Sequence, residues 1–252
     1  MTVAMRVDGV DISRHQRHVR IDWTKLKRAG CDWMYHKSSE GGSFKDEAYG
    51  TRRKQAADNG MPFGPYHFAR PSGGDARAEA RFFIDVANFK RGDLRPCLDL
   101  ETTEIIRGKA LLEWADNFCD EVKDLTGAVP LVYTPYMLSK ELEDKALFWV
   151  PRYNNDNRRP VRDWDIWQFS NGVLGVPNQV AGIGHVDLNY SSKVGVNALR
   201  FPSKVSVPKS RGRRIEEAID LLVKAEKGAA EGTRRDDILD KAIAELMAIK
   251  PL

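Results

Sequence analysis

Residues 95–101 read Arg-Pro-Cys-Leu-Asp-Leu-Glu, an apolar run that ends in two carboxylates two positions apart. Side chains two apart in a strand point to the same face, so Asp99 and Glu101 share a face while Leu100 packs behind them. An Asp-x-Glu triplet alone is a weak signal, because acidic pairs are common on exposed strands. Here the preceding Pro-Cys-Leu predicts a buried strand, and two acids on a buried strand are unusual. The stretch therefore indicates a functional site.

Two further carboxylates end apolar runs in the same way, Asp11 after the first expected strand and Asp187 after the last. In a barrel of parallel strands, active sites lie where the C-terminal ends of the strands meet. Closure of the barrel makes the first and last strands neighbours, which brings Asp11 and Asp187 together beside Asp99 and Glu101. Carboxylates gathered in a water-poor pocket repel one another and resist desolvation. We interpret them as an acid–base site for a polar, uncharged substrate, with a glycosidic bond as the leading candidate.

Short apolar runs alternate with amphipathic stretches through the first two thirds of the chain. The patterns predict strands at residues 7–12, 33–38, 63–69, 95–101, 129–133, 147–153, 165–169 and 185–188. They predict helices at residues 22–29, 46–59, 75–90 and 109–126, with Asp22 and Asp75 as N-caps. After about residue 145 the spacers are rich in Asn, Arg, Pro and Gly and have no helical period. We therefore expect an α/β fold over residues 1–200, an eight-stranded barrel that lacks its last helices.

A basic linker that contains Pro and Ser covers residues 201–212, and the pattern beyond it is purely helical. Apolar residues repeat at helical spacing on both sides of a Gly-rich turn, which predicts an α-helical hairpin over residues 213–252. A hairpin of this size buries little core alone. Its apolar faces are expected to pack on the barrel, on a second copy in a homodimer, or on another partner.

The composition is that of an ordinary globular protein of 252 residues, with a mild net charge of +4. This charge does not demand nucleic acid, although it favours loose attraction to an anionic surface such as a bacterial wall. Three cysteines are too few for a disulfide framework. No apolar run approaches the length of a membrane span, and the first residues lack the features of a signal peptide. We expect synthesis in the cytoplasm, no membrane insertion, and release by another factor if the protein acts on the cell wall.

Six motifs occur in an order that resembles glycoside hydrolase family 25, the Chalaropsis-type lysozymes common in bacteriophage endolysins. They are Gly9-Val-Asp-Ile-Ser13, Lys37-Ser-Ser-Glu-Gly41, Gly64-Pro-Tyr-His-Phe68, Leu98-Asp-Leu-Glu101, Ile166-Trp-Gln-Phe169 and Val186-Asp-Leu-Asn189. The resemblance implies a modified TIM barrel of the (β/α)5β3 type. It also implies hydrolysis of the β-1,4 bond between N-acetylmuramic acid and N-acetylglucosamine in peptidoglycan, in the service of phage-mediated host lysis.

The resemblance further implies roles for the acids. Glu101 is expected to be the general acid, with a raised pKa that keeps it protonated. Asp99 is expected to stay ionised, either stabilising the oxocarbenium-like transition state or orienting the 2-acetamido group, while Asp11 and Asp187 complete the cluster. Whether a carboxylate or the acetamido group attacks is left open. Because sugar rings offer apolar faces for stacking, we expect further cleft residues near the strand ends. These are Tyr66, Tyr133, Tyr153 and Trp167, with Gln168 close by.

Two alternatives to a muramidase remain at this stage. His15, His18, His36 and His67 lie near the expected site, and histidines with carboxylates can bind a metal. A metal-dependent deacetylase or phosphodiesterase is therefore one alternative, although the usual short ligand spacings are absent and we expect neither a metal nor another cofactor. A non-catalytic module that binds cell-wall glycan is the other alternative.

Overall fold

Strand β1 (Gly9–Ile12) has a neighbour on each side, and this closes the sheet into a barrel. It pairs in parallel with β2 (Trp33–Glu40) and antiparallel with β9 (Asp187–Tyr190). The strands between them are β4 (Phe63–Phe68), β5 (Cys97–Asp99), β6 (Leu131–Tyr133), β7 (Leu147–Pro151) and β8 (Ile166–Asn171). Neighbouring strands in the series β1, β2, β4, β5, β6, β7 and β8 are parallel. Strand β9 is antiparallel to both of its neighbours, β8 and β1. The expected eight-stranded, TIM-like barrel is confirmed.

The computed structural model describes residues 6–71, 74–90, 92–101, 106–135, 146–155, 158–161, 164–191, 197 and 199–200. The chain divides into two compact units, residues Met1–Ser206 and Val207–Leu252. The predicted linker and helical hairpin lie outside the described residues and stay predictions. The same holds for any helix between β6 and β7, and so for the (β/α)5β3 count. Among the described residues, no helix is long and apolar enough to cross a membrane.

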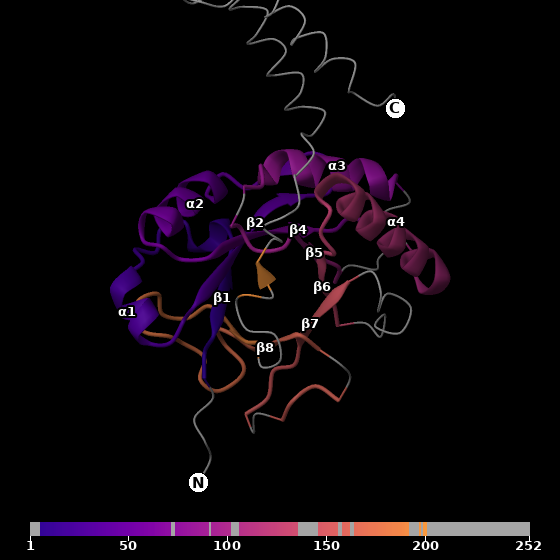
Figure 1. Ribbon diagram of the computed structural model, residues 1–252. Coiled ribbons are helices and arrows are strands. Elements are labelled where there is room, and N and C mark those ends of the chain that lie inside the picture. The colour runs from indigo at the N-terminus through magenta and orange to yellow at the C-terminus, as the bar shows by residue number, and fades with distance from the viewer. Residues whose placement is uncertain are drawn as a thin grey trace, which may run out of the picture. The chain divides into compact units, whose positions relative to one another are not determined.

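Four helices cover the outside of the barrel, and each follows one of the parallel strands (Figure 1). They are α1 (Trp23–Arg28), α2 (Tyr49–Asp58), α3 (Ala76–Ala87) and α4 (Gly108–Thr126). The N-caps predicted for α1 and α3 are confirmed, since Asp22 accepts from the backbone N–H of Lys25 and Asp75 from that of Arg77. Asp46 does not cap α2, which begins three residues later, because its carboxylate accepts from Ala48 and Arg14 instead.

One short strand was not predicted from the sequence. Strand β3 (Phe44–Lys45) pairs antiparallel with the last two residues of β2, beyond the part of β2 that pairs with β1. Two residues are too short to show a side-chain alternation, so the sequence carries no signal for this strand. Ser39 and Glu40 of β2 therefore pair with β4 on one side and with β3 on the other.

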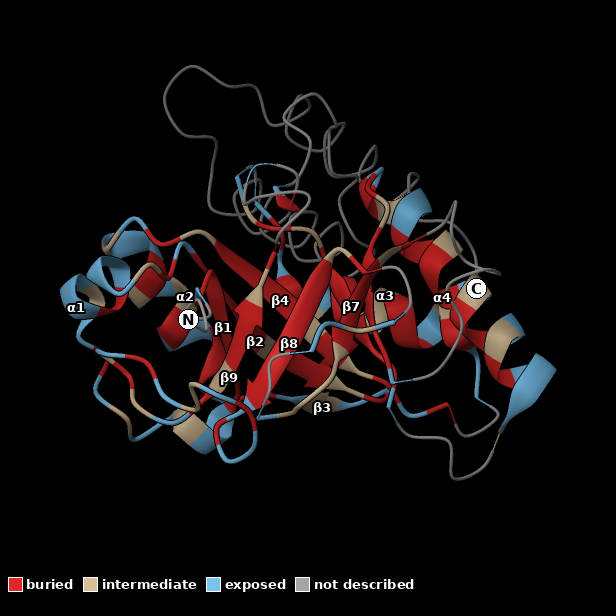
Figure 2. Ribbon diagram, turned by 90° about the horizontal axis from the view of Figure 1, so that it is seen from below, coloured by how far each residue is buried: buried red, intermediate tan, exposed pale blue. Residues whose placement is uncertain are grey.

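The strands of the barrel are largely buried (Figure 2), and large aromatic side chains make up much of the core between them. The indole of Trp33 meets the rings of Tyr35 and Trp149 edge-on, with ring centroids 5.7 and 6.1 Å apart. Trp149 is also in contact with Tyr133, at 5.6 Å between centroids. Since Trp149 and Tyr133 line the cavity described below as well, the packed aromatic core is also its floor.

The closeness of β1 to this core gives a first prediction. A Cβ at Gly9 would lie 2.2 Å from the ring of Trp33, which is fully buried and has no room to move. We expect Gly9→Ala to lower the free energy of unfolding by about 1–3 kcal/mol, the usual cost of overpacking a core. Denaturant unfolding followed by tryptophan fluorescence measures the change.

Gly50→Ala is the matched control, because this exposed glycine in α2 has open space where the Cβ would lie. The control should be neutral or stabilise the protein by up to about 1 kcal/mol through helix propensity. Equal effects of the two substitutions would contradict the packing of Gly9 on Trp33.

Candidate active site

A cavity of about 580 Å³ opens at the end of the barrel where the parallel strands terminate. All four predicted carboxylates line it, as do Tyr66, Tyr133, Tyr153 and Gln168. The remaining lining residues are Ile12, Ser13, Arg14, His15, Gln16, Lys37, Glu40, Phe68, Arg70, Cys97 and Trp149. The structure therefore brings together side chains that are far apart in the sequence, as expected for the C-terminal end of such a barrel.

Asp187 reaches the cavity by a route that the sequence did not predict. It was expected to end the last strand, but it is the first residue of β9. Because β9 runs against the other strands, its first residue lies at the same end of the barrel as their last residues. In the β1–β9 register Asp187 lies directly opposite Asp11, so the expected proximity is present although the strand direction was wrong.

Amide groups surround the buried carboxylate of Asp11, whose residue is only 7% exposed. Gln168 donates from Nε2 to both oxygens, at 3.1 and 2.9 Å, and Asn189 donates from Nδ2 to Oδ2 at 2.7 Å. The orientation of Asn189 is fixed in turn, since its Oδ1 accepts from the indole N–H of Trp149 at 2.8 Å. Tyr133 donates to Oε1 of Gln168 at 2.8 Å, and Tyr153 donates to the same oxygen.

One proton is shared by the pair formed by Asp11 and Asp187. Burial raises the pKa of Asp11, while the hydrogen bonds from Asn189 and Gln168 oppose this shift. Burial, followed by the charge of Asp11, raises the pKa of Asp187 to about 9. Asp11 accepts from two amide groups, and the described residues include no such donor to Asp187, so the pair favours its proton on Asp187 and its negative charge on Asp11.

Asp99 has a raised pKa. Burial is the main cause that raises it well above the ordinary value, and repulsion from Glu101 and Asp11 adds to it. This shift disfavours an ionised Asp99 in the free site, and the ionised state expected from the sequence stays a prediction. Its buried Oδ1 has no hydrogen-bond partner in the part of the chain that the structure describes.

Glu101 lies two residues beyond Asp99, just past the end of β5, and is exposed where it lines the cavity. Desolvation raises its pKa and the charge of Asp11 adds to the effect, while Lys37 and Arg70 act against it. A carboxyl group with a raised pKa that a ligand can reach has the properties of a general acid.

Trp167 is the one predicted site residue that the structure does not bring to the cavity. Neighbouring side chains in a strand point to opposite faces, and Gln168 points to Asp11. Trp167 is fully buried on the other face, where its ring packs near Trp164 and its indole N–H donates to the carbonyl of Arg152 at 2.9 Å. It is a packing residue, and the prediction placed it on the wrong face of the strand.

The sequence analysis missed Asn189, which donates to Asp11, and the lining residues Arg14 and Arg70. Asn189 could have been found, since it stands two positions after Asp187 in the same strand and therefore shares its face. Arg14 and Arg70 follow β1 and β4 within two residues, but charged residues after strands are too common to single out. Lys37 and Glu40, which both line the cavity, form an ion pair.

The histidines do not form a cluster with the acids. His15 lines the cavity, whereas His36 and His67 are fully buried outside its lining. Within the described residues, no group of three or more His, Cys, Asp or Glu side chains is arranged to hold a metal ion.

The shared proton leads to a prediction about stability and pH. Between about pH 4 and pH 9 the folded protein keeps a proton on Asp187 that the unfolded chain has lost, so this group makes stability fall as the pH rises. Asp187→Asn removes the titration and keeps a donor for Asp11. We expect the variant to melt about 2–4 °C above the wild type at pH 8, the shift that about 1 kcal/mol gives in a domain of this size.

At pH 4 the same variant should melt at the wild-type temperature, as measured by calorimetry. Asp58→Asn, on the exposed side of α2, is the control and should behave alike at both pH values. An equal shift for Asp187→Asn at pH 4 and pH 8 would argue against the shared proton.

Comparisons with known proteins agree with this geometry. A family model described as glycosyl hydrolases family 25 matches residues 10–175, more than half of the chain. The uncharacterized protein YegX of Escherichia coli K12 is 30% identical over 196 residues, which cover 73% of this chain and 68% of YegX. Lysozyme M1 of Streptomyces globisporus is 26% identical over 211 residues, covering 73% and 67% of the two chains.

Solved structures show the same likeness. A bacterial lysozyme from Streptomyces coelicolor has a TM-score of 0.66 and 25% identity, and the match covers 82% of this chain and all of that one. The catalytic domain of endolysin ply40 from Listeria monocytogenes bacteriophage P40 has a TM-score of 0.65 and 28% identity, with 79% and 100% covered. The chain therefore belongs to glycosyl hydrolases family 25 and is a glycoside hydrolase.

Proposed function

We propose that this glycoside hydrolase is an N-acetylmuramidase, which cleaves the β-1,4 bond between N-acetylmuramic acid and N-acetylglucosamine in peptidoglycan. The observation that carries the proposal is the convergence of Asp11, Asp99, Glu101 and Asp187 on one cavity. Its volume of about 580 Å³ lies within the range of small-ligand sites. The names of two relatives, Lysozyme M1 and the N,O-diacetylmuramidase of Arthroderma benhamiae, support the choice of substrate.

Glu101 is the general acid in this proposal. It combines a raised pKa with exposure to the cavity, so it can hold a proton and deliver it to the glycosidic oxygen. As the bond between that oxygen and C1 breaks, positive charge develops on the sugar ring. The ionised carboxylate of Asp11 lies in the same cavity and stabilises that charge.

Asp99 is proposed to orient the substrate. Its unpartnered Oδ1 offers an acceptor to the N–H of the 2-acetamido group, and this hydrogen bond favours the ionised form that the free site disfavours. Two routes remain for the attack at C1, by a protein carboxylate or by the acetamido oxygen held in place by Asp99. In either route a water molecule then completes the hydrolysis, and the deprotonated Glu101 takes up a proton from that water.

The walls of the cavity suit a sugar. Tyr66, Tyr133, Tyr153 and Trp149 surround the carboxylates, and aromatic rings stack on the apolar faces of pyranose rings. The hydroxyls of Tyr133 and Tyr153 donate to the side-chain oxygen of Gln168, and Gln168 in turn donates to Asp11 and orients it.

For the biological setting we propose degradation of a host cell wall during bacteriophage release. The likeness to the catalytic domain of the phage endolysin ply40 supports this setting. Such a role requires the protein to reach the peptidoglycan after its synthesis. A homodimer through the C-terminal helices stays a prediction, as does the absence of nucleic-acid partners.

Glu101→Gln tests the proposed acid. The amide keeps the shape of the side chain but cannot give up a proton, so we expect kcat on purified peptidoglycan to fall by about 10²- to 10⁴-fold. The melting temperature should stay close to that of the wild type, because Glu101 is exposed. Release of new reducing ends, with mass spectrometry of the products, measures the activity and identifies the bond that is cut.

Glu113→Gln is the matched control, since Glu113 lies on the exposed face of α4 and pairs only loosely with Lys109 at 3.3 Å. It should keep full activity. An unimpaired Glu101→Gln, or binding of peptidoglycan by the wild type without any product, would overturn the proposed function.

A further inference from the structure

The cavity is lined by charged groups of both signs. Four carboxylates line it, and so does a group of basic side chains, namely Arg14, His15, Lys37 and Arg70, which we call the basic rim. These residues come from the segment after β1, from β2 and from the segment after β4. A neutral glycan gives no reason for several cations to line its binding site.

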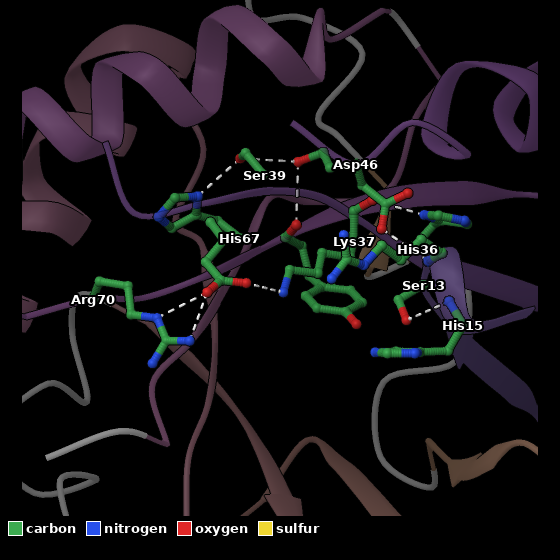
Figure 3. Close-up of polar contacts among 12 residues, drawn as sticks. Ser13, His15, His36, Lys37, Ser39, Asp46, His67 and Arg70 are labelled. Carbon is green, nitrogen blue, oxygen red and sulfur yellow. Dashed lines mark hydrogen bonds and ion pairs between the residues drawn. The ribbon is translucent and has the colours of Figure 1, made fainter. Parts of the chain in front are cut away.

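Arg70 is held rigidly in the basic rim (Figure 3). Its guanidinium donates to Glu40 Oε1 through Nε at 2.8 Å and Nη2 at 2.6 Å, and lies 4.8 Å above the ring of Phe68. Its backbone N–H donates to the buried carboxylate of Glu79 at 2.9 Å. An arginine fixed at three points loses little freedom when it binds a ligand.

A buried network, of which Figure 3 shows the contact between His67 and Ser39, supports this position. Glu79 Oε1 also lies 2.8 Å from Nε2 of His67, and Nδ1 of His67 lies 2.8 Å from Oγ of Ser39. Since a carboxylate only accepts, Nε2 of the neutral imidazole carries the proton, and Ser39 donates to Nδ1. Burial lowers the pKa of His67, which agrees with a neutral ring. The network ties β2, β4 and α3 together directly beneath Arg70.

Lys37 and Arg14 complete the cationic surface. Lys37 pairs with Glu40 and lies 4.5 Å above the ring of Phe68. The guanidinium of Arg14 lies 5.0 Å from the ring of Phe44 and forms no ion pair with any residue that the structure describes. Glu40 is thus the carboxylate shared by two of the three permanent cations, and positive charge remains in excess in the basic rim.

The basic rim lies close to the reacting groups. Lys37 acts on the pKa of both Asp99 and Glu101, and Arg70 acts on that of Glu101. Lys37 and Arg70 line the same cavity as these two acids, so the cations and the acids face one space. An anion held by the rim would therefore be carried by a sugar at the cleaved bond and not by a distant part of the glycan.

We propose that the basic rim is a subsite for a carboxylate carried by the sugar at the scissile bond, a proposal that rests on the proposed function. In peptidoglycan such a carboxylate has two sources. One is the lactyl group on C3 of muramic acid when it is free, and the other is the stem peptide attached to that lactyl group. Arginine suits either source, because its planar fork matches a carboxylate.

The test compares glycan strands that differ in charge. Strands stripped of peptide by an amidase carry free lactyl carboxylates, and coupling these to methylamine gives neutral strands of the same length. We expect the wild type to cleave the carboxylate strands with a kcat/KM about tenfold higher than the neutral strands, the usual scale of a charge-assisted hydrogen bond. Strands that still bear peptide form the third substrate and separate the two sources.

Arg14→Met and Arg70→Met remove the charge and keep most of the stem. Each should raise KM on carboxylate strands by about fivefold to tenfold, and Arg14→Met should change the kinetics on neutral strands by less than about twofold. Arg28→Met, an exposed arginine on α1 outside the cavity, is the control and should leave both substrates unaffected. Because Arg14 is exposed, its variant keeps the test valid should Arg70→Met fail to fold.

A different result is expected if the basic rim only adjusts the pKa of Glu101 and binds no carboxylate. Loss of Arg70 would then shift the pH dependence of kcat and lower activity on charged and neutral strands alike, which would overturn the subsite. Equal cleavage of both strands by the wild type would also overturn it while leaving the muramidase intact. If the wild type cleaves none of the strands, the proposed function itself would be overturned.

Discussion

The site depends on one ionised carboxylate that receives only hydrogen-bond donors. Asp11 is buried among the amide N–H groups of Gln168 and Asn189. Neither amide is free to turn, because Trp149 donates to the oxygen of Asn189 and Tyr133 to that of Gln168. Each amide must therefore present its NH2 group to Asp11, which offsets part of the cost of burying a charge. Trp149 and Tyr133 also belong to the barrel core, so the packing of the core fixes the charge state of the site.

A fixed negative charge at Asp11 governs the other acids in the cavity. Its charge is among the causes that raise the pKa of Asp187, Asp99 and Glu101. The four carboxyl groups thus form one coupled set, in which the amide donors oppose the raised pKa of Asp11 while the other three hold protons more tightly than they do in water. Among the three, Glu101 is the exposed one, and for this reason it is the one suited to give its proton to a substrate.

The sequence reveals the strand ends better than it reveals strand direction or side-chain facing. Asp11 and Asp99 were found because each directly follows a buried apolar run, and the order of the parallel strands then brings them to one end. The direction of β9 depends on a loop whose path has no sequence signature, so Asp187 was placed at the wrong end of its strand. Trp167 was misplaced because β8 is buried on both faces, which hides the alternation that separates it from Gln168. The cations of the rim come from β2 and from the segments that follow β1 and β4, where charged residues are too common to single out.

The carboxylate of Glu40 links the acidic and the basic groups of the cavity. Cations beside a general acid lower its pKa, and Lys37 and Arg70 do act on Glu101 in this direction. Both of them also pair with Glu40, so part of their charge is compensated before it reaches Glu101. The balance leaves the pKa of Glu101 raised despite two cations nearby. A cationic rim and a protonated acid can therefore line the same cavity, because Glu40 holds the cations in place while Asp11 keeps the proton on the acid.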